Sequence, residues 1–337
     1  MTDEKRKTSQ SRYGITIPFE GIPLSDQPNL YRELEELGYT DLWSAEADST
    51  DAFVPLALAA TSTKHIRLGT AVVPAYTRGP GLLACQVDAI SELAIDRFVF
   101  GIGTSSNVIV SKWNNIEFKE PYRKVRDTVN FLRKALSGEK VRETYDTFEV
   151  DGFKLGRNRG FGAPPRVIPP IYIAALRPQM LRLAGRLGDG AILNWFGAAD
   201  VEQVKKEVLA GSKGQDRDLV ARIFVIPNAE DSQARAIGRM AIAAYLNVEV
   251  YKQFHIWLGR DEILKDMWEL WQSGDRKKAL EAIPDEVVDD LIIHGSYDEC
   301  RNHVMRYVRA GITTPVLAII PVGVDHVEAI KNMAPNS

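Results

Sequence analysis

Cysteine is scarce in this chain, which has only Cys85 and Cys300 among its 337 residues. There is no CxxC pair and no cluster of cysteine with histidine. Each thiol lies in a segment with a helical pattern, where a lone cysteine is most often a small buried apolar side chain. We therefore expect neither a disulfide nor a metal site.

An excess of basic charge is also absent, because 42 lysines and arginines stand against 45 aspartates and glutamates. Without a basic field, the chain is not expected to bind nucleic acid or an anionic membrane. Apolar runs such as residues 56–60 fall far short of the ~20 residues of a membrane helix. The first 12 residues are polar and lack the apolar segment of a leader, so we expect a disordered tail and a cytoplasmic protein.

Several common catalytic motifs are missing. The sequence contains no GxGxxG, GxxxxGK[ST], HExxH or GxSxG motif and no EF-hand loop. The five histidines show no metal-ligand spacing. These absences argue against the usual nucleotide-binding, protease and esterase classes.

What the sequence does contain is a regular alternation of strand and helix patterns. Eight strand-like segments begin near residues 13, 41, 66, 97, 171, 191, 221 and 315, and each except the last is followed by a helical pattern. Eight is the number that a (β/α)8 barrel needs, whereas a doubly wound sheet usually has five or six strands and a glycine-rich first turn. The sequence predicts an α/β fold, a TIM barrel forming one domain over residues 13–330.

Three segments interrupt the alternation. Residues 104–120 predict a polar loop, and residues 139–168 predict a hairpin followed by a long loop. Residues 249–290 predict a helical insertion that is rich in tryptophan, with aromatic side chains from Tyr251 to Trp271. These aromatics suit a lid over an apolar substrate, a subunit contact or a local core, and the pattern alone does not separate the three.

Ordered motifs carry a family resemblance. Residues 66–74 (IRLGTAVVP), 97–103 (RFVFGIG), 118–123 (FKEPYR) and 184–192 (AGRLGDGAI) resemble blocks of the bacterial luciferase-like monooxygenase family, and of its coenzyme F420-dependent branch. The resemblance covers most of residues 13–320. It implies a TIM-like barrel that holds a flavin, or the deazaflavin coenzyme F420, at the carboxyl-terminal mouth of the strands.

The resemblance also implies where the cofactor binds. In the F420 branch a non-prolyl cis peptide bond after the third strand backs the middle ring, and here it corresponds to Ala71 and Val72. The segment bordering the ring corresponds to Gly103, Thr104, Ser105 and Ser106, whose small side chains admit a flat ring and whose hydroxyls suit its polar edge. Members that use FMN often carry arginine at the position of Thr104, so its absence favours F420 over FMN.

A phosphate site is implied in the loop after the fifth strand, at Ala174, Ala175, Leu176 and Arg177, where backbone amides precede a helix. Many F420-dependent members have two glycines in place of Leu176 and Arg177. That departure changes the backbone but adds a cation suited to phosphate.

Glu46 is the candidate catalytic residue, because it follows the second strand and is expected to point into the mouth. An alternative is that Glu46 only bonds the backbone or pairs with an arginine. Related sugar-phosphate dehydrogenases have histidine in place of Glu46, glutamate in place of Ser106 and lysine in place of Gly197, so a sugar-phosphate substrate is not expected. Asn194 and Trp195 follow the sixth strand and either line the pocket or pack in the core.

These features predict an oxidoreductase that transfers hydride between F420 and a small organic substrate of hydrophobic character. Two alternatives stay open: a monooxygenase that consumes reduced FMN, and a non-catalytic flavin-binding protein. Family members are often dimers, so the resemblance also implies a homodimer.

Overall fold

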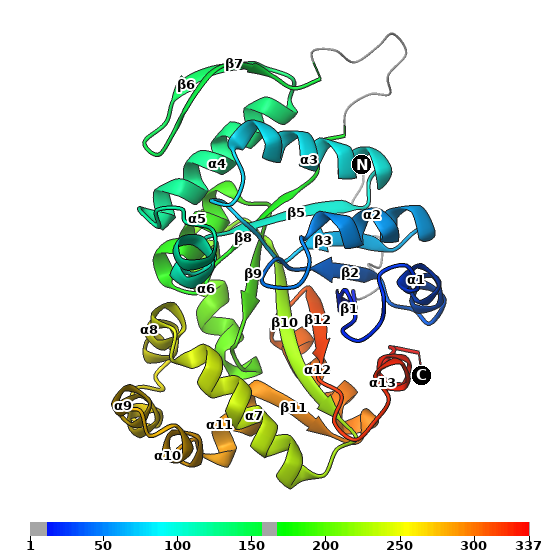
Figure 1. Cartoon of the computed structure of the whole chain (residues 1–337), viewed down its shortest axis with the longest axis vertical. Helices are drawn as coiled ribbons and strands as arrows, with labels where there is room; N and C mark the ends of the chain where they lie inside the picture. Colours follow the sequence, from blue (N-terminus) through cyan, green and yellow to red (C-terminus); the bar gives the residue numbers. More distant parts are fainter. Residues whose placement is uncertain (1–11, 157–166, 337) are drawn as a thin grey trace, which may run out of the picture.

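The computed structural model describes residues 12–156 and 167–336, and its centre is a closed parallel barrel (Figure 1). In the described part, eight strands pair around the barrel, and β9 pairs with β10 to close it. They are β1 (Gly14–Ile17), β2 (Asp41–Ser44), β3 (Arg67–Thr70), β5 (Phe98–Gly103), β8 (Ile171–Ala174), β9 (Gly190–Asn194), β10 (Asp218–Pro227) and β12 (Thr314–Ile319). The predicted TIM barrel is confirmed.

Helices follow these strands and cover the outside of the barrel. They are α1 (Gln27–Glu36), α2 (Phe53–Ser62), α3 (Pro80–Leu93), α4 (Pro121–Leu136), α5 (Pro178–Leu187), α6 (Val201–Gly211), α7 (Asp231–Leu246), α12 (Tyr297–Ala310) and α13 (His326–Asn332). Proline lies in the first turn of α1, α3, α4 and α5, where its missing N–H has no helical partner to lose. The prediction that no helix follows the last strand is wrong, because α13 follows β12. The Asp325 side chain caps the first turn of α13 by accepting from the Glu328 amide.

The barrel interior has a polar floor and an apolar middle. At the floor, Arg67 pairs with Asp41 and donates to Thr314 Oγ1 at 2.8 Å. Above it lies an interior cluster of large buried side chains, Trp43, Val99, Tyr172, Ile192, Val220 and Val316. The interior is therefore filled below the mouth, and in barrels of this kind ligands bind at the carboxyl ends of the strands.

Two of the predicted interruptions lie beside the barrel. A short strand, β4 (Val73–Pro74), continues β3 and pairs with β5. The expected hairpin is present as β6 (Lys140–Thr144) and β7 (Glu149–Lys154), while residues 157–166 of the predicted long loop lie outside the described residues. The prediction of a plain loop over 104–120 is wrong, because the π-helix η1 (Val108–Trp113) forms there around buried Val110.

The third interruption is a helical lobe beside α7 (Figure 1). It contains α8 (Glu249–Trp257), α9 (Lys265–Ser273), α10 (Arg276–Glu281) and α11 (Asp285–Leu291), with its own buried cluster around Met267 and Trp268. A strand that the sequence analysis missed, β11 (Ile292–Gly295), follows α11 and pairs with the second half of β10. It directly follows the helical insertion, where the sequence analysis expected no further strand before residue 315.

The two cysteines differ in exposure, since Cys300 is buried but Cys85 is exposed, contrary to expectation.

In the part of the chain that the structure describes, no helix has both the length and the apolarity to cross a membrane. The single domain over 13–330 and the tail over 1–12 stay predictions, and residues 1–11 lie outside the described ones.

Candidate functional site

Small residues from neighbouring strands converge at the barrel mouth. Gly103 ends β5 so close to its neighbours that a Cβ there would lie 2.8 Å from Val72 Cγ2 and 3.0 Å from Ala174 Cβ. Ala71, Val72 and Ala174 pack on the interior cluster from above. We call Ala71, Val72, Gly103 and Ala174 the small-residue shelf. The glycine lets Val72 and Ala174 pack closely together, and Ala71, Val72 and Ala174 are half-buried at the mouth.

The peptide bond between Ala71 and Val72 is cis, as the resemblance implies. It lies between β3 and β4, where the Ala71 amide donates to the Ser44 carbonyl at 2.6 Å. Val73 and Pro74 then pair with Ile102 and Gly103 of β5. The predicted residues after the third and fourth strands of the barrel, β3 and β5, are thus brought together.

The loop after β5 keeps its hydroxyls near the mouth. Ser105 has a positive φ of 60°, and Thr104 Oγ1 donates to the Ser105 carbonyl at 3.2 Å. Ser106 Oγ accepts from the Ile109 amide at 3.3 Å and so begins the π-helix η1. Thr104, Ser105 and Ser106 are all half-buried, so a ligand on the shelf can reach them.

The loop after β8 leads into α5. The Ala175 amide donates to the Ile192 carbonyl at 3.0 Å, which fixes the loop to β9, while Leu176 is half-buried. Arg177 is exposed at the position before the helix, and its guanidinium makes no ion pair with any residue that the structure describes. The first turn of α5 therefore presents amides and a free cation, the combination that suits phosphate.

Glu46 makes an ion pair at the rim of the mouth. Its Oε1 accepts from Arg78 Nη1 at 2.6 Å and from Thr77 Oγ1 at 3.1 Å, and its Oε2 accepts from the Ala52 amide at 3.4 Å. Both charged side chains are largely buried, with 13% of Glu46 and 11% of Arg78 exposed. The arginine pairing and backbone bond that the sequence analysis left as an alternative are present. Arg78 and Thr77 were missed as partners, since nothing local links them to a residue about thirty positions away.

Asn194 and Trp195 separate into different environments. Asn194 ends β9, and its Nδ2 donates to Tyr251 Oη of α8 at 3.2 Å. Trp195 is only 1% exposed, and its ring stacks on Phe224 with a centroid distance of 4.1 Å. Trp195 belongs to the buried cluster around Met267 and Trp268, so it packs in a core, which was one of the two alternatives.

The tryptophan-rich insertion contributes mainly to that core. Trp268 is buried, and its indole N–H donates to the Leu246 carbonyl at 2.9 Å. Trp271 is only half-buried, with the Arg276 guanidinium 3.9 Å from its ring centroid. Of the three roles considered, a local core describes Trp268.

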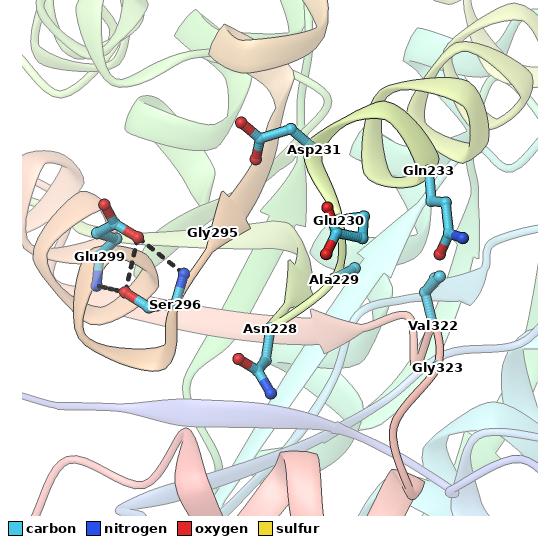
Figure 2. Close-up of a pocket in the computed structure, with 10 residues that line it drawn as sticks. All are labelled: Asn228, Ala229, Glu230, Asp231, Gln233, Gly295, Ser296, Glu299, Val322 and Gly323. Carbon is cyan, nitrogen blue, oxygen red and sulfur yellow. Dashed lines mark hydrogen bonds between the residues drawn. The ribbon is translucent and has the colours of Figure 1, made fainter.

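A separate open cavity of about 540 Å³ lies where β10, β11 and β12 end (Figure 2). Glu230, Asp231 and Glu299 line it, and Glu299 already accepts from the Ser296 amide at 2.8 Å. Three carboxylates disfavour an anion such as phosphate. None of the predicted cofactor residues lines this cavity, which is therefore distinct from the small-residue shelf.

The described residues contain no group of three or more histidine, cysteine, aspartate or glutamate side chains arranged to hold a metal ion. The fold is a parallel (β/α)8 barrel with the small-residue shelf at its mouth. A family comparison is more specific. The model of the luciferase-like monooxygenase family matches residues 5–314, and the chain belongs to this family.

Individual relatives have low sequence identity to this chain. The chain is 27% identical over 308 residues to the 5,10-methylenetetrahydromethanopterin reductase of Archaeoglobus fulgidus, covering 88% of this chain and 90% of that protein. The solved structure of the F420-dependent tetrahydromethanopterin reductase of Methanopyrus kandleri matches with a TM-score of 0.75 at 20% identity, covering 97% and 98% of the two chains. An FMN complex of a Baeyer–Villiger monooxygenase component from Pseudomonas putida matches with a TM-score of 0.65 at 14% identity, covering 97% of each chain. The two structures establish a common fold.

Proposed function

We propose that this chain is an oxidoreductase that transfers hydride between coenzyme F420 and a small organic substrate of hydrophobic character. The observation that carries the proposal is the small-residue shelf at the mouth of a luciferase-like barrel. The similarity to an archaeal reductase of this family and to an F420-dependent reductase structure supports it. Thr104, in place of arginine, favours F420 over FMN.

The residues of the mouth fit such a cofactor. The shelf would hold the flat ring next to Ala71 and Val72, and the hydroxyls of Thr104 to Ser106 would face its polar edge. Arg177, with the amides around Ala175 and Leu176, suits its phosphate. When bound, the deazaflavin supplies a ring carbon that accepts or donates two electrons as hydride. The protein's part is then to orient the substrate, exclude water and move one proton.

Cofactor choice gives the first prediction. We expect the purified chain to bind oxidised F420 at least about tenfold more tightly than FMN, because position 104 holds threonine in place of the arginine that family members using FMN often carry. Fluorescence titration with each cofactor measures this ratio. Tighter binding of FMN would favour the monooxygenase alternative, and binding of both without turnover with any donor or acceptor would favour the non-catalytic one.

The second prediction concerns Glu46, which we propose as the group that transfers a proton. We expect Glu46→Gln to lower turnover by about a hundredfold, since positioned acid–base groups contribute at least that much. The affinity for F420 should change less than about twofold, because the amide retains the length of the side chain and one acceptor oxygen for Arg78 and Thr77, and Glu46 is not among the residues proposed to hold the cofactor. Steady-state rates and cofactor titration measure both quantities.

The matched control for Glu46 is Glu207→Gln. Glu207 of α6 also pairs with an arginine, Arg182, at 2.6 Å, but on the outside of the barrel. It should keep normal turnover. Equal turnover of the Glu46 and Glu207 variants would remove Glu46 from the reaction and leave its pair with Arg78 as a structural contact.

We also propose a homodimer formed through α2 and α3. Val54, Leu82 and Leu93 are 49%, 59% and 48% exposed, and Leu82 and Leu93 lie on one face of α3, three helical turns apart. An apolar face of this kind favours a protein contact. Light scattering should give twice the chain mass of 37.6 kDa, and the double variant Leu82→Glu/Leu93→Glu should give the single mass. A monomeric wild-type protein contradicts the proposal.

A cytoplasmic location stays a prediction.

A further inference from the structure

Arg222 is a charged residue in the interior of the barrel. On β10 it lies opposite Asn194 of β9 and Val316 of β12. Residues that are opposite in a parallel ladder point to the same face, and Val316 belongs to the interior cluster. Arg222 and Asn194 therefore face into the barrel, beside the shelf strand β8, which pairs with β9.

The Arg222 guanidinium lacks an anionic partner. Its Nε is buried without a hydrogen-bond partner, and no carboxylate in the described ranges 12–156 and 167–336 pairs with it. Its Cζ lies 4.8 Å from the centroid of the Phe224 ring. At the floor of the barrel, by contrast, Arg67 has Asp41, Thr314 and Tyr172 as partners. A partly buried cation without an anion is destabilising, and an anionic ligand removes that cost.

Two neutral polar groups lie beside Arg222. Asn194 donates one amide N–H to Tyr251 Oη, which leaves its second N–H and the Tyr251 O–H available as donors. Burial raises the pKa of Tyr251, while the Asn194 hydrogen bond and the Arg222 charge act in the opposite direction. Tyr251 is therefore a neutral donor at physiological pH, within the electrostatic field of the guanidinium.

We propose that Arg222, Asn194 and Tyr251 form a substrate subsite that binds a carboxylate. The proposal rests on the proposed function, because it places the substrate next to the shelf that would hold the ring. A guanidinium matches the two oxygens of a carboxylate, and Phe224 offers an apolar surface for the adjoining part of the substrate. A phosphate dianion favours several cations, whereas this cluster supplies one. The substrate class is thus an organic acid with an apolar body.

Benzoate and its neutral analogue benzamide test the subsite. Both are titrated into the wild-type protein, with intrinsic tryptophan fluorescence as the readout. We expect benzoate to bind at least about tenfold more tightly than benzamide, and Arg222→Met to abolish the difference. The exposed control Arg142→Met should retain it, because 71% of that side chain is in solvent.

Thermal unfolding of the ligand-free proteins checks the same residue independently. Arg222→Met should unfold at or above the wild-type temperature, because the substitution replaces an uncompensated cation in the interior by an apolar side chain. A lower unfolding temperature, or a variant that does not fold, would assign Arg222 a structural role and overturn the proposal. Equal affinities of the wild type for benzoate and benzamide would also overturn it.

F420 titration separates this inference from the proposed function. Weaker F420 binding by Arg222→Met, with the benzoate preference intact, would assign the guanidinium to the cofactor and overturn the subsite. Failure of the wild type to bind F420 would overturn the proposed function, whereas a wild type that binds F420 but does not prefer benzoate over benzamide would overturn only the subsite.

Discussion

Arg67→Met is expected to lower the free energy of unfolding by about 3–5 kcal/mol, because it leaves one member of a buried ion pair without its partner. Asp41 is fully buried, and the side chain of Arg67 is 10% exposed. Burial disfavours the charged form of Arg67, but Asp41, Tyr172 and Asp218 outweigh it and raise its pKa. After the substitution, the remaining ion-pair partner of Asp41 among the described residues is Arg12, which is 41% exposed and 3.2 Å away.

Urea denaturation of the purified variant measures the loss. The matched control is Arg142→Met, which removes an arginine from a hairpin ion pair that is mostly in solvent. That change should cost less than about 1 kcal/mol. Similar losses for the two variants would show that the floor network contributes no more than a surface pair.

Gly101→Ala is expected to destabilise the barrel by about 3 kcal/mol or more, at the upper end of overpacking costs. A Cβ at this position would lie 1.9 Å from the Thr70 carbonyl oxygen and 2.5 Å from Ile192 Cδ1. The Thr70 hydroxyl also joins the two strands, accepting from the Gly101 amide at 2.7 Å and donating to its carbonyl at 2.8 Å. The backbone atoms of β3 and β5 therefore have little freedom to move apart.

The comparison for Gly101 is Gly79→Ala. Gly79 has φ −64° and ψ 147°, and no atom lies within 4 Å of a Cβ built there. Its substitution should change stability by less than about 1 kcal/mol, because alanine adopts this backbone without strain. Circular dichroism during thermal unfolding compares the two variants, and an unchanged transition for Gly101→Ala would contradict the steric argument.

Much of the fold was predictable from local patterns. The alternation of strands and helices follows the predicted order, and the hairpin expected within residues 139–168 is present as β6 and β7. The errors have a physical cause. Strand β11 is stabilised by pairing with β10, and the π-helix η1 by burial of Val110, and neither contact leaves a periodic signal in a short segment.

The candidate site was predictable only in part. Motifs placed Ala71, Val72, Gly103 and Ala174 near one another because they follow consecutive strands of a barrel, and these residues do meet at the shelf. Their roles toward a cofactor, like those of Thr104 to Ser106 and Arg177, stay predictions. Arg222 and Tyr251 were missed, since a lone arginine within an apolar strand and a tyrosine in an insertion carry no motif.

By itself, the sequence determined the alternation of strands and helices, the count of eight that closes a barrel, and the family. Those properties depend on residue periodicity and on motifs within a few positions of each other. Tertiary structure decided which side chains became partners, such as Glu46 with Arg78 and Asn194 with Tyr251. It also left Arg222 without an anionic partner among the described residues. The reason is that strand register and barrel closure bring distant residues within bonding distance, and these depend on the packing of the whole chain.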